Sequence, residues 1–175
     1  MQNKEVQPQR LHPLLESKVR LDTIIIGGKT PQSILKEYRK RIRATEYANK
    51  SMMRGAGFIT LTVPMQIDIV IVQVQDLAIQ KEYPTVEEIY ARAQELGLGL
   101  LPAEAAPHYR LQYMDQPLGE TLFAGMEPIV GSDGGPNVFG LAHDRRGLWL
   151  FGTWVLPSTR RRPEDKFMFG LSEAA

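Results

Sequence analysis

The most suggestive chemical motif in this sequence is residues 27–30, Gly-Gly-Lys-Thr, which follow a short apolar run and precede a predicted helix. A strand, a Gly-Lys-Thr turn and a helix are the ground plan of a phosphate-binding P-loop. That loop needs a further glycine with four residues between it and Gly28, and the sequence has Thr23 at this place. Thr30 followed by Pro31 is a favoured pair at the start of a helix. We therefore interpret the motif as a turn and a helix cap, and not as a nucleotide site.

Catalytic and metal-binding groups are hard to assemble from the remaining residues. The chain has no Cys, and its histidines, His12, His108 and His143, do not follow the His-Glu-x-x-His pattern of a helical zinc site. Glu120 and Glu127 are seven residues apart, so on one continuous strand they would face opposite sides. We therefore expect no catalytic residues, no metal and no cofactor, and the sequence favours a binding protein over an enzyme.

A basic stripe is the first of two candidate binding surfaces. Residues 31–53 have the periodicity of an amphipathic helix that ends before Gly55. The cations of this segment fall opposite its apolar side chains, together with one tyrosine. The stripe over residues 31–54 consists of Lys36, Arg39, Lys40, Arg43, Tyr47, Lys50 and Arg54. It predicts contact with the phosphate backbone of nucleic acid, and a solvated helix face is the alternative interpretation.

Aromatic residues near the C-terminus form the second candidate surface. In a strand over residues 148–156, Trp149 and Phe151 would point to one face and Trp154 to the other. Both faces are apolar, so the strand is either buried on both sides or open to a partner on one. Trp and Arg are common interface anchors. The predicted partner-binding residues are Trp149, Trp154, Arg160, Arg161 and Arg162.

These two surfaces lead to two hypotheses about function. The first is a non-catalytic module that binds a protein or a ligand through the aromatic C-terminal sheet, with self-association as one form of it. The alternative is a nucleic-acid-associated protein that uses the basic helix over residues 31–54.

Both surfaces need a scaffold, and five apolar runs separated by turn signals predict one. The runs cover residues 109–113, 122–129, 138–142, 148–156 and 167–171. Gly, Pro and Asp separate them, and connections this short favour antiparallel neighbours. We predict an α+β fold: an antiparallel meander of about five strands over residues 109–171, two main helices (31–53 and 85–96) packed on it, and two further strands (58–63 and 67–74) within residues 58–74.

Local signals complete the predicted organisation. Thr85 and Glu88 form a capping box, and Gly97 follows the end of that helix. Residues 11–21 predict a short helix, and residues 23–26 predict a strand. We expect residues 1–10 to be a loose N-terminal segment and residues 11–175 to be a single domain, helical and basic over 11–57 and β-rich over 58–175.

The composition is that of a soluble globular protein, with 43% hydrophobic and 23% charged residues and a net charge of +1. The charges are unevenly placed: residues 1–60 have 12 Lys and Arg against 5 Asp and Glu, whereas residues 61–129 have 3 against 10. No apolar run approaches the roughly 20 residues of a membrane span, and the N-terminus lacks the apolar core of a signal peptide. We therefore expect no membrane partner and a bacterial, cytoplasmic location.

The second half of the chain also carries a set of short motifs. They are Glu88-Ile89-Tyr90, Arg92-Ala93, Glu95-Leu96-Gly97-Leu98, Pro102, Glu104, Arg110-Leu111-Gln112-Tyr113, Asp115-Gln116-Pro117, Gly119-Glu120, Met126-Glu127-Pro128-Ile129, Ser132-Asp133-Gly134, Gly147-Leu148-Trp149-Leu150 and Phe167. As a set they resemble a family of small uncharacterised proteins from candidate bacterial phyla. The chain departs from that pattern at Leu101, near which the family has Cys, and over residues 160–165, where the family has a Trp-containing loop. The resemblance implies a shared fold and brings no activity with it.

Overall fold

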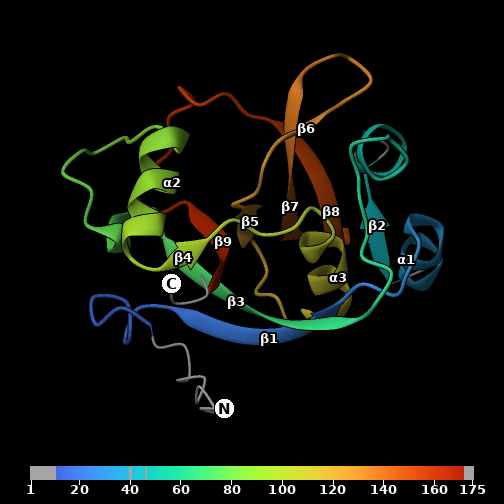
Figure 1. Cartoon of the computed structure of the whole chain (residues 1–175), viewed down its shortest axis with the longest axis horizontal. Coiled ribbons are helices and arrows are strands. Elements are labelled where there is room, and N and C mark those ends of the chain that lie inside the picture. Colours follow the sequence, from blue (N-terminus) through green and yellow to red (C-terminus); the bar gives the residue numbers. More distant parts are fainter. Residues whose placement is uncertain (1–10, 40, 46, 172–175) are drawn as a thin grey trace, which may run out of the picture.

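A computed structural model describes residues 11–39, 41–45 and 47–171 of the chain. Within these residues, nine strands form one mixed sheet that curls into a half-barrel (Figure 1). The strand order is β1-β3-β9-β5-β7-β8-β2, with β4 paired to β9 and β6 paired to β7. The strands are β1 (Arg20–Ile26), β2 (Ile42–Ala44), β3 (Met65–Gln73), β4 (Leu98–Gly99), β5 (Thr121–Ala124), β6 (Ile129–Val130), β7 (Pro136–Asp144), β8 (Gly147–Trp154) and β9 (Lys166–Leu171).

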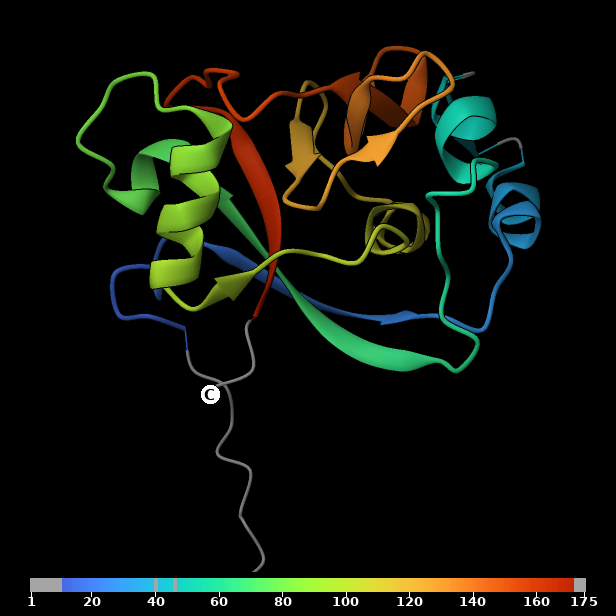
Figure 2. The ribbon, with the colours of Figure 1, turned by 45° about the horizontal axis from the view of Figure 1, so that its top comes forward.

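Short helices pack on both faces of this sheet. They are α1 (Pro31–Tyr38), α2 (Val86–Glu95), α3 (Ala105–Gln112), a π-helical segment (Tyr47–Met53) and a 3-10 turn (Val74–Leu77). The sheet curls around α3, so we call the face toward α3 concave (Figure 2). On the convex face, α2 buries Ile89 against Val70, Phe167 and Phe169. α2 packs on the convex face at β3 and β9, whereas β8 and β2 lie at the other end of the sheet, away from this helix (Figure 1).

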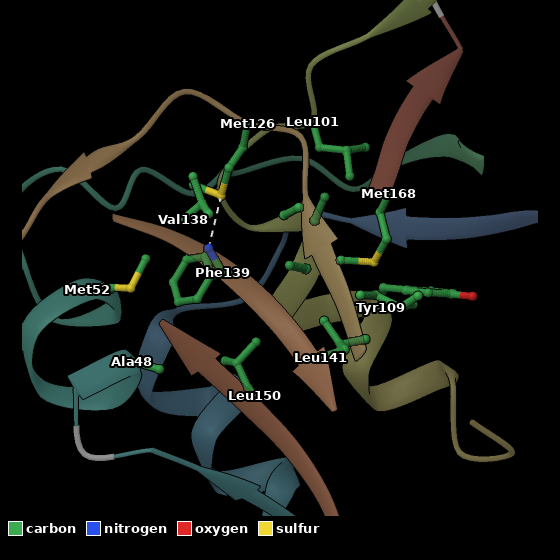
Figure 3. Close-up of a cluster of buried hydrophobic side chains, with 14 of the residues drawn as sticks. Ala48, Met52, Leu101, Tyr109, Met126, Val138, Phe139, Leu141, Leu150 and Met168 are labelled. Carbon is green, nitrogen blue, oxygen red and sulfur yellow. Dashed lines mark hydrogen bonds between the residues drawn. The ribbon is translucent and has the colours of Figure 1, made fainter. Parts of the chain in front are cut away.

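The concave core draws on elements from the whole chain (Figure 3). Met52 of the π-helical segment and Tyr109 of α3 meet Phe139 and Leu150 from the β7/β8 hairpin in one apolar cluster. The backbone N–H of Phe139 donates to the Sδ atom of Met126 at 3.5 Å. This shared core holds the sheet in its curved shape.

The predicted antiparallel meander with two main helices is wrong. The β7/β8 hairpin does form, with Asn137 opposite Trp154 and Asp144 opposite Gly147. However, β9 pairs in parallel with β5, and β2 pairs in parallel with β8. The loop after β8 is long enough to carry the chain past β7 and β5, so β9 lies between β5 and β3. The result is a mixed sheet in which β3 and β9 are both interior strands.

The predicted strand over residues 109–113 is also wrong, because residues 109–112 form the second half of α3 and Tyr113 is its C-cap. Tyr109 and Tyr113 are four residues apart and therefore lie on one side of the helix. Their rings stack with centroids 5.1 Å apart. Five residues were too few to distinguish this helical spacing from a buried strand.

The predicted helix over residues 31–53 is broken into three elements. It begins as expected, since the Thr30 hydroxyl accepts the Ser33 N–H at 3.2 Å, but α1 ends at Tyr38 and Arg39 has a φ of 40°. The chain then forms β2, where Ile42 lies opposite Leu148, before the π-helical segment begins. An apolar residue at position 42 fits both the buried face of a helix and a buried position on a strand. The apolar pattern therefore did not show that this segment pairs with β8 at the edge of the sheet.

Two smaller predictions failed and three held, one of them the strand over residues 23–26, which lies within β1. Residues 58–63 form an irregular loop in which Phe58 is buried, not a strand, and residues 11–21 form turns leading into β1, not a helix. The strand over residues 67–74 is confirmed as the interior strand β3. The capping box is also confirmed, because Thr85 and Glu88 each bind the backbone N–H of the other at the start of α2.

Candidate functional site

A row of aromatic side chains crosses the convex face of the sheet beside α2. Strand pairing places Phe151 of β8 opposite Gly140 of β7, Gly140 opposite Phe123 of β5, and Phe123 opposite Phe167 of β9. Trp149 is two residues before Phe151 and lies on the same face of β8, because side chains alternate between the two faces along a strand. Phe123, Trp149 and Phe151 are half-buried. The row therefore presents ring surface to the solvent.

Gly140 allows these rings to meet. A Cβ atom at this position would lie 2.2 Å from Cζ of Phe151 and 2.8 Å from the carbonyl oxygen of Leu122. The Phe151 ring thus lies across the backbone of β7 and reaches Phe123 edge-to-face, with centroids 6.1 Å apart. The ring centroids of Phe123 and Phe167 are in turn 5.7 Å apart. Because Gly140 has no side chain, the rings on both sides of it come into contact and form one continuous aromatic surface.

Arginine guanidinium groups lie over this row. Arg161 lies 4.0 Å from the ring centroid of Phe123, and its burial lowers the pKa of its guanidinium. Over Trp149 lie Arg43 of β2 at 5.5 Å and Arg146 of the β7/β8 turn at 5.0 Å. These distances are within the roughly 6 Å at which a cation is attracted to an aromatic ring.

The indole of Trp149 is fixed in position by the β7/β8 turn. Its Nε1–H donates to Oδ1 of Asp144 at 2.9 Å. This hydrogen bond, followed by those from Arg146, lowers the pKa of the Asp144 carboxyl. A ring held in this way loses little conformational freedom on binding, which favours its use as a stacking surface.

The residues predicted to bind a partner are split between different surfaces. Trp149 and Arg161 belong to the aromatic row. Trp154 is 57% exposed and lies at the end of β8, next to the backbone of Gly135. Arg160 and Arg162 are exposed in the loop before β9, where Arg160 donates to the carbonyl oxygen of Tyr83 at 3.1 Å.

The basic stripe does not exist as one helical face. Lys36 lies on α1, Arg39 follows it, Lys50 lies on the π-helical segment and Arg54 comes after that segment. Lys40 lies outside the described residues, as does the side chain of Tyr47. Arg43 joins the aromatic row instead, because β2 pairs with β8 and places Arg43 opposite Trp149. Sequence reasoning missed Phe123, Gly140 and Arg146, whose roles depend on strand pairing.

A polar hollow of about 360 Å³ opens at one end of the concave face. Its lining includes Glu120, whose carboxylate accepts the Tyr113 hydroxyl at 2.8 Å and the Lys166 ammonium at 2.6 Å. Arg20 binds Asp22 at 2.7 Å and lies 4.2 Å from the Tyr113 ring centroid. These charges are paired with one another, so the hollow resembles an ion-pair network more than a prepared binding site.

The buried phenols of Tyr38, Tyr109 and Tyr113 predict alkaline unfolding. Burial raises the pKa of Tyr38 and Tyr109 well above the usual value, and burial with the Glu120 hydrogen bond raises the pKa of Tyr113 to about 12. An unfolded chain releases these protons near pH 10. Their contribution to stability is therefore complete below about pH 10 and is lost as the pH rises toward 12.

Tyrosinate absorbance and far-UV circular dichroism, recorded together against pH, test this prediction. We expect the buried phenols to ionise only as the helical and strand signals disappear. Ionisation of all tyrosines near pH 10 with an unchanged dichroism spectrum would contradict it.

The histidines have structural contacts. His108 is buried beside Glu104, with its Nε2 3.2 Å from Oε2 of that residue, and burial lowers its pKa. Nδ1 of His143 lies 2.6 Å from the carbonyl oxygen of Gln116. In the described part of the chain, no group of three or more His, Asp or Glu side chains is placed to hold a metal ion. No described helix is both long and apolar enough to cross a membrane.

Comparisons with protein-family models, curated proteins and solved structures found no match to this chain. The resemblance to a family from candidate bacterial phyla therefore stays a prediction.

Proposed function

We propose that this protein is a non-catalytic binding module whose convex sheet face binds single-stranded nucleic acid. The observation that carries the proposal is the placement of Arg43, Arg146 and Arg161 over the rings of Trp149 and Phe123. Single-stranded nucleic acid offers what such a surface recognises, namely flat bases that stack on rings and phosphates that pair with guanidinium groups.

The mode of binding follows from the shape of the surface. Bases are available for stacking only when they are not enclosed in a duplex. The aromatic row lies on the face of the sheet, whereas groove reading uses a projecting helix or β-ribbon. On binding, the guanidinium groups exchange part of their contact with the rings for phosphate oxygens, and the bases take the vacated ring surface. Stacking of this kind contributes about 1–3 kcal/mol per base and depends little on sequence.

Fluorescence anisotropy with a labelled oligouridylate, measured from about 50 to 200 mM salt, tests this proposal. Replacing Arg43 and Arg146 with Gln should reduce the slope of log affinity against log salt by about 1.4, because single strands lose about 0.7 for each neutralised phosphate. Replacing Trp149 with Leu keeps an apolar side chain but removes the stacking surface, and should weaken binding about tenfold.

The matched control is the double replacement of Lys36 and Arg39 with Gln. It removes the same charge from exposed positions at α1 that lie outside the aromatic row. We expect the control to change the salt dependence much less than the change at Arg43 and Arg146. Equal effects of the two double replacements, or the absence of salt-sensitive binding at low salt, would contradict the proposal.

A further inference from the structure

An apolar groove of about 370 Å³ lies between α2 and the two segments that face it. One wall is the side of α2 that carries Val86, Tyr90 and Ala91. The opposite wall is formed by Pro128 and by the residues that follow β8, including Leu156. This groove lies outside the aromatic row, so an inference about it does not depend on the nucleic-acid proposal.

Hydrogen bonds hold the two walls at a fixed separation. The first N–H groups of α2 donate to the opposite wall, Val86 to the carbonyl oxygen of Thr159 at 2.8 Å and Glu87 to that of Pro157 at 3.1 Å. On the floor, the Tyr90 hydroxyl lies 3.3 Å from both the backbone N and the carbonyl oxygen of Met126. The groove is therefore formed before any ligand binds, which lowers the entropy cost of occupying it.

The charges of the groove are of one sign. Glu87 stands on the α2 wall and Glu127 on the opposite wall, and both are exposed. Among the residues that the structure describes, those lining the groove include no Lys or Arg. The apolar side chain of Leu156 in the opposite wall is 43% exposed. A ligand that matches this surface has an apolar group flanked by positive charge.

We propose that the groove binds a peptide segment of a partner protein that places an apolar side chain between Lys or Arg residues. The α2 wall runs from Val86 to Gln94, which corresponds to about 12 Å of helix. About four residues of extended chain span that length. The apolar side chain enters between Ala91 and Leu156, and the flanking cations meet Glu87 and Glu127.

Selection from a displayed library of random heptapeptides against the full chain tests this inference. We expect the enriched sequences to share a Leu, Ile or aromatic residue with Lys or Arg on both sides. A labelled synthetic copy of the most enriched peptide is then titrated by fluorescence anisotropy. Ala91→Trp, which fills the groove from an exposed helix position, should weaken its binding at least tenfold, and so should Glu87→Lys combined with Glu127→Lys.

The matched control combines Glu16→Lys with Glu164→Lys, which makes the same change in net charge at exposed positions outside the groove. It should leave peptide affinity within about twofold. Thermal unfolding checks that each variant remains folded. Failure to enrich any shared pattern, enrichment of acidic peptides, or equal binding by the Ala91→Trp variant would overturn the inference. Oligouridylate binding by the Ala91→Trp variant should be unchanged, so the two proposals can fail separately.

Discussion

Replacing Glu104 with alanine is expected to lower the free energy of unfolding by about 3–5 kcal/mol. The Glu104 side chain is 1% exposed and joins segments far apart in the chain. Its Oε1 accepts the Leu61 N–H at 2.8 Å, and its Oε2 accepts the Gly27 N–H at 3.1 Å. Alanine would leave both backbone donors without this acceptor, and each hydrogen bond to a charged group contributes about 1.5–3 kcal/mol.

The isosteric change to glutamine separates hydrogen bonding from packing. The glutamine amide has one acceptor oxygen and one NH₂ group, so one of the two backbone donors would face another donor. We therefore expect Glu104→Gln to cost about 2 kcal/mol although it creates no cavity. Urea denaturation followed by circular dichroism measures both values. Glu82→Ala, at an exposed position, is the control and should stay within about 0.5 kcal/mol of the wild type. A Glu104→Ala cost below about 1 kcal/mol would contradict the structural role assigned here.

The features that could be predicted from the sequence were those specified by neighbouring residues. The cap at Thr30 and the capping box of Thr85 and Glu88 each depend on residues within one helical turn, and both were identified correctly. The β7/β8 hairpin was found for the same reason, because its turn lies between the strands that it joins. In each case the physical cause is local.

The features that were missed depend on contacts between distant segments. Ile42 satisfies the pattern of an amphipathic helix and also that of an edge strand, and only the free edge of β8 beside it decides between them. The position of β9 between β3 and β5 likewise depends on long-range pairing. Glu104 was part of a matched motif, yet its two backbone partners are 43 and 77 residues away in sequence. Periodicity has no information on such partners.

The aromatic row shows the same division between residue type and placement. Trp149 and Arg161 were chosen from the sequence because Trp and Arg are frequent at interfaces. Arg161 lies over Phe123, which is 38 residues earlier in the sequence, and Trp149 lies under Arg43, which is 106 residues earlier. Gly140 would not be selected by any rule based on side-chain chemistry, since its contribution is the space it leaves for Phe151.

Gly125 is packed closely against the ring of Phe169. A Cβ atom at Gly125 would lie 2.2 Å from Cε1 and 2.3 Å from Cδ1 of the fully buried Phe169 ring. Gly125→Ala should therefore cost about 1–3 kcal/mol through overpacking. Phe169→Ala should cost about 3–5 kcal/mol because it leaves a cavity among α2, β3 and β9.

The double replacement distinguishes this steric explanation from a backbone effect. A methyl group at position 125 would enter the space vacated by the ring, so the double variant should be more stable than the sum of the single costs predicts, by about 1–2 kcal/mol. The N–H of Gly125 donates to Met168 at 2.8 Å and its carbonyl accepts from Leu101 at 2.7 Å, and both bonds survive either change. Urea denaturation of the four proteins in the cycle gives the coupling energy. Additive costs would show that the strain at Gly125 lies in the backbone and not in its contact with the Phe169 ring.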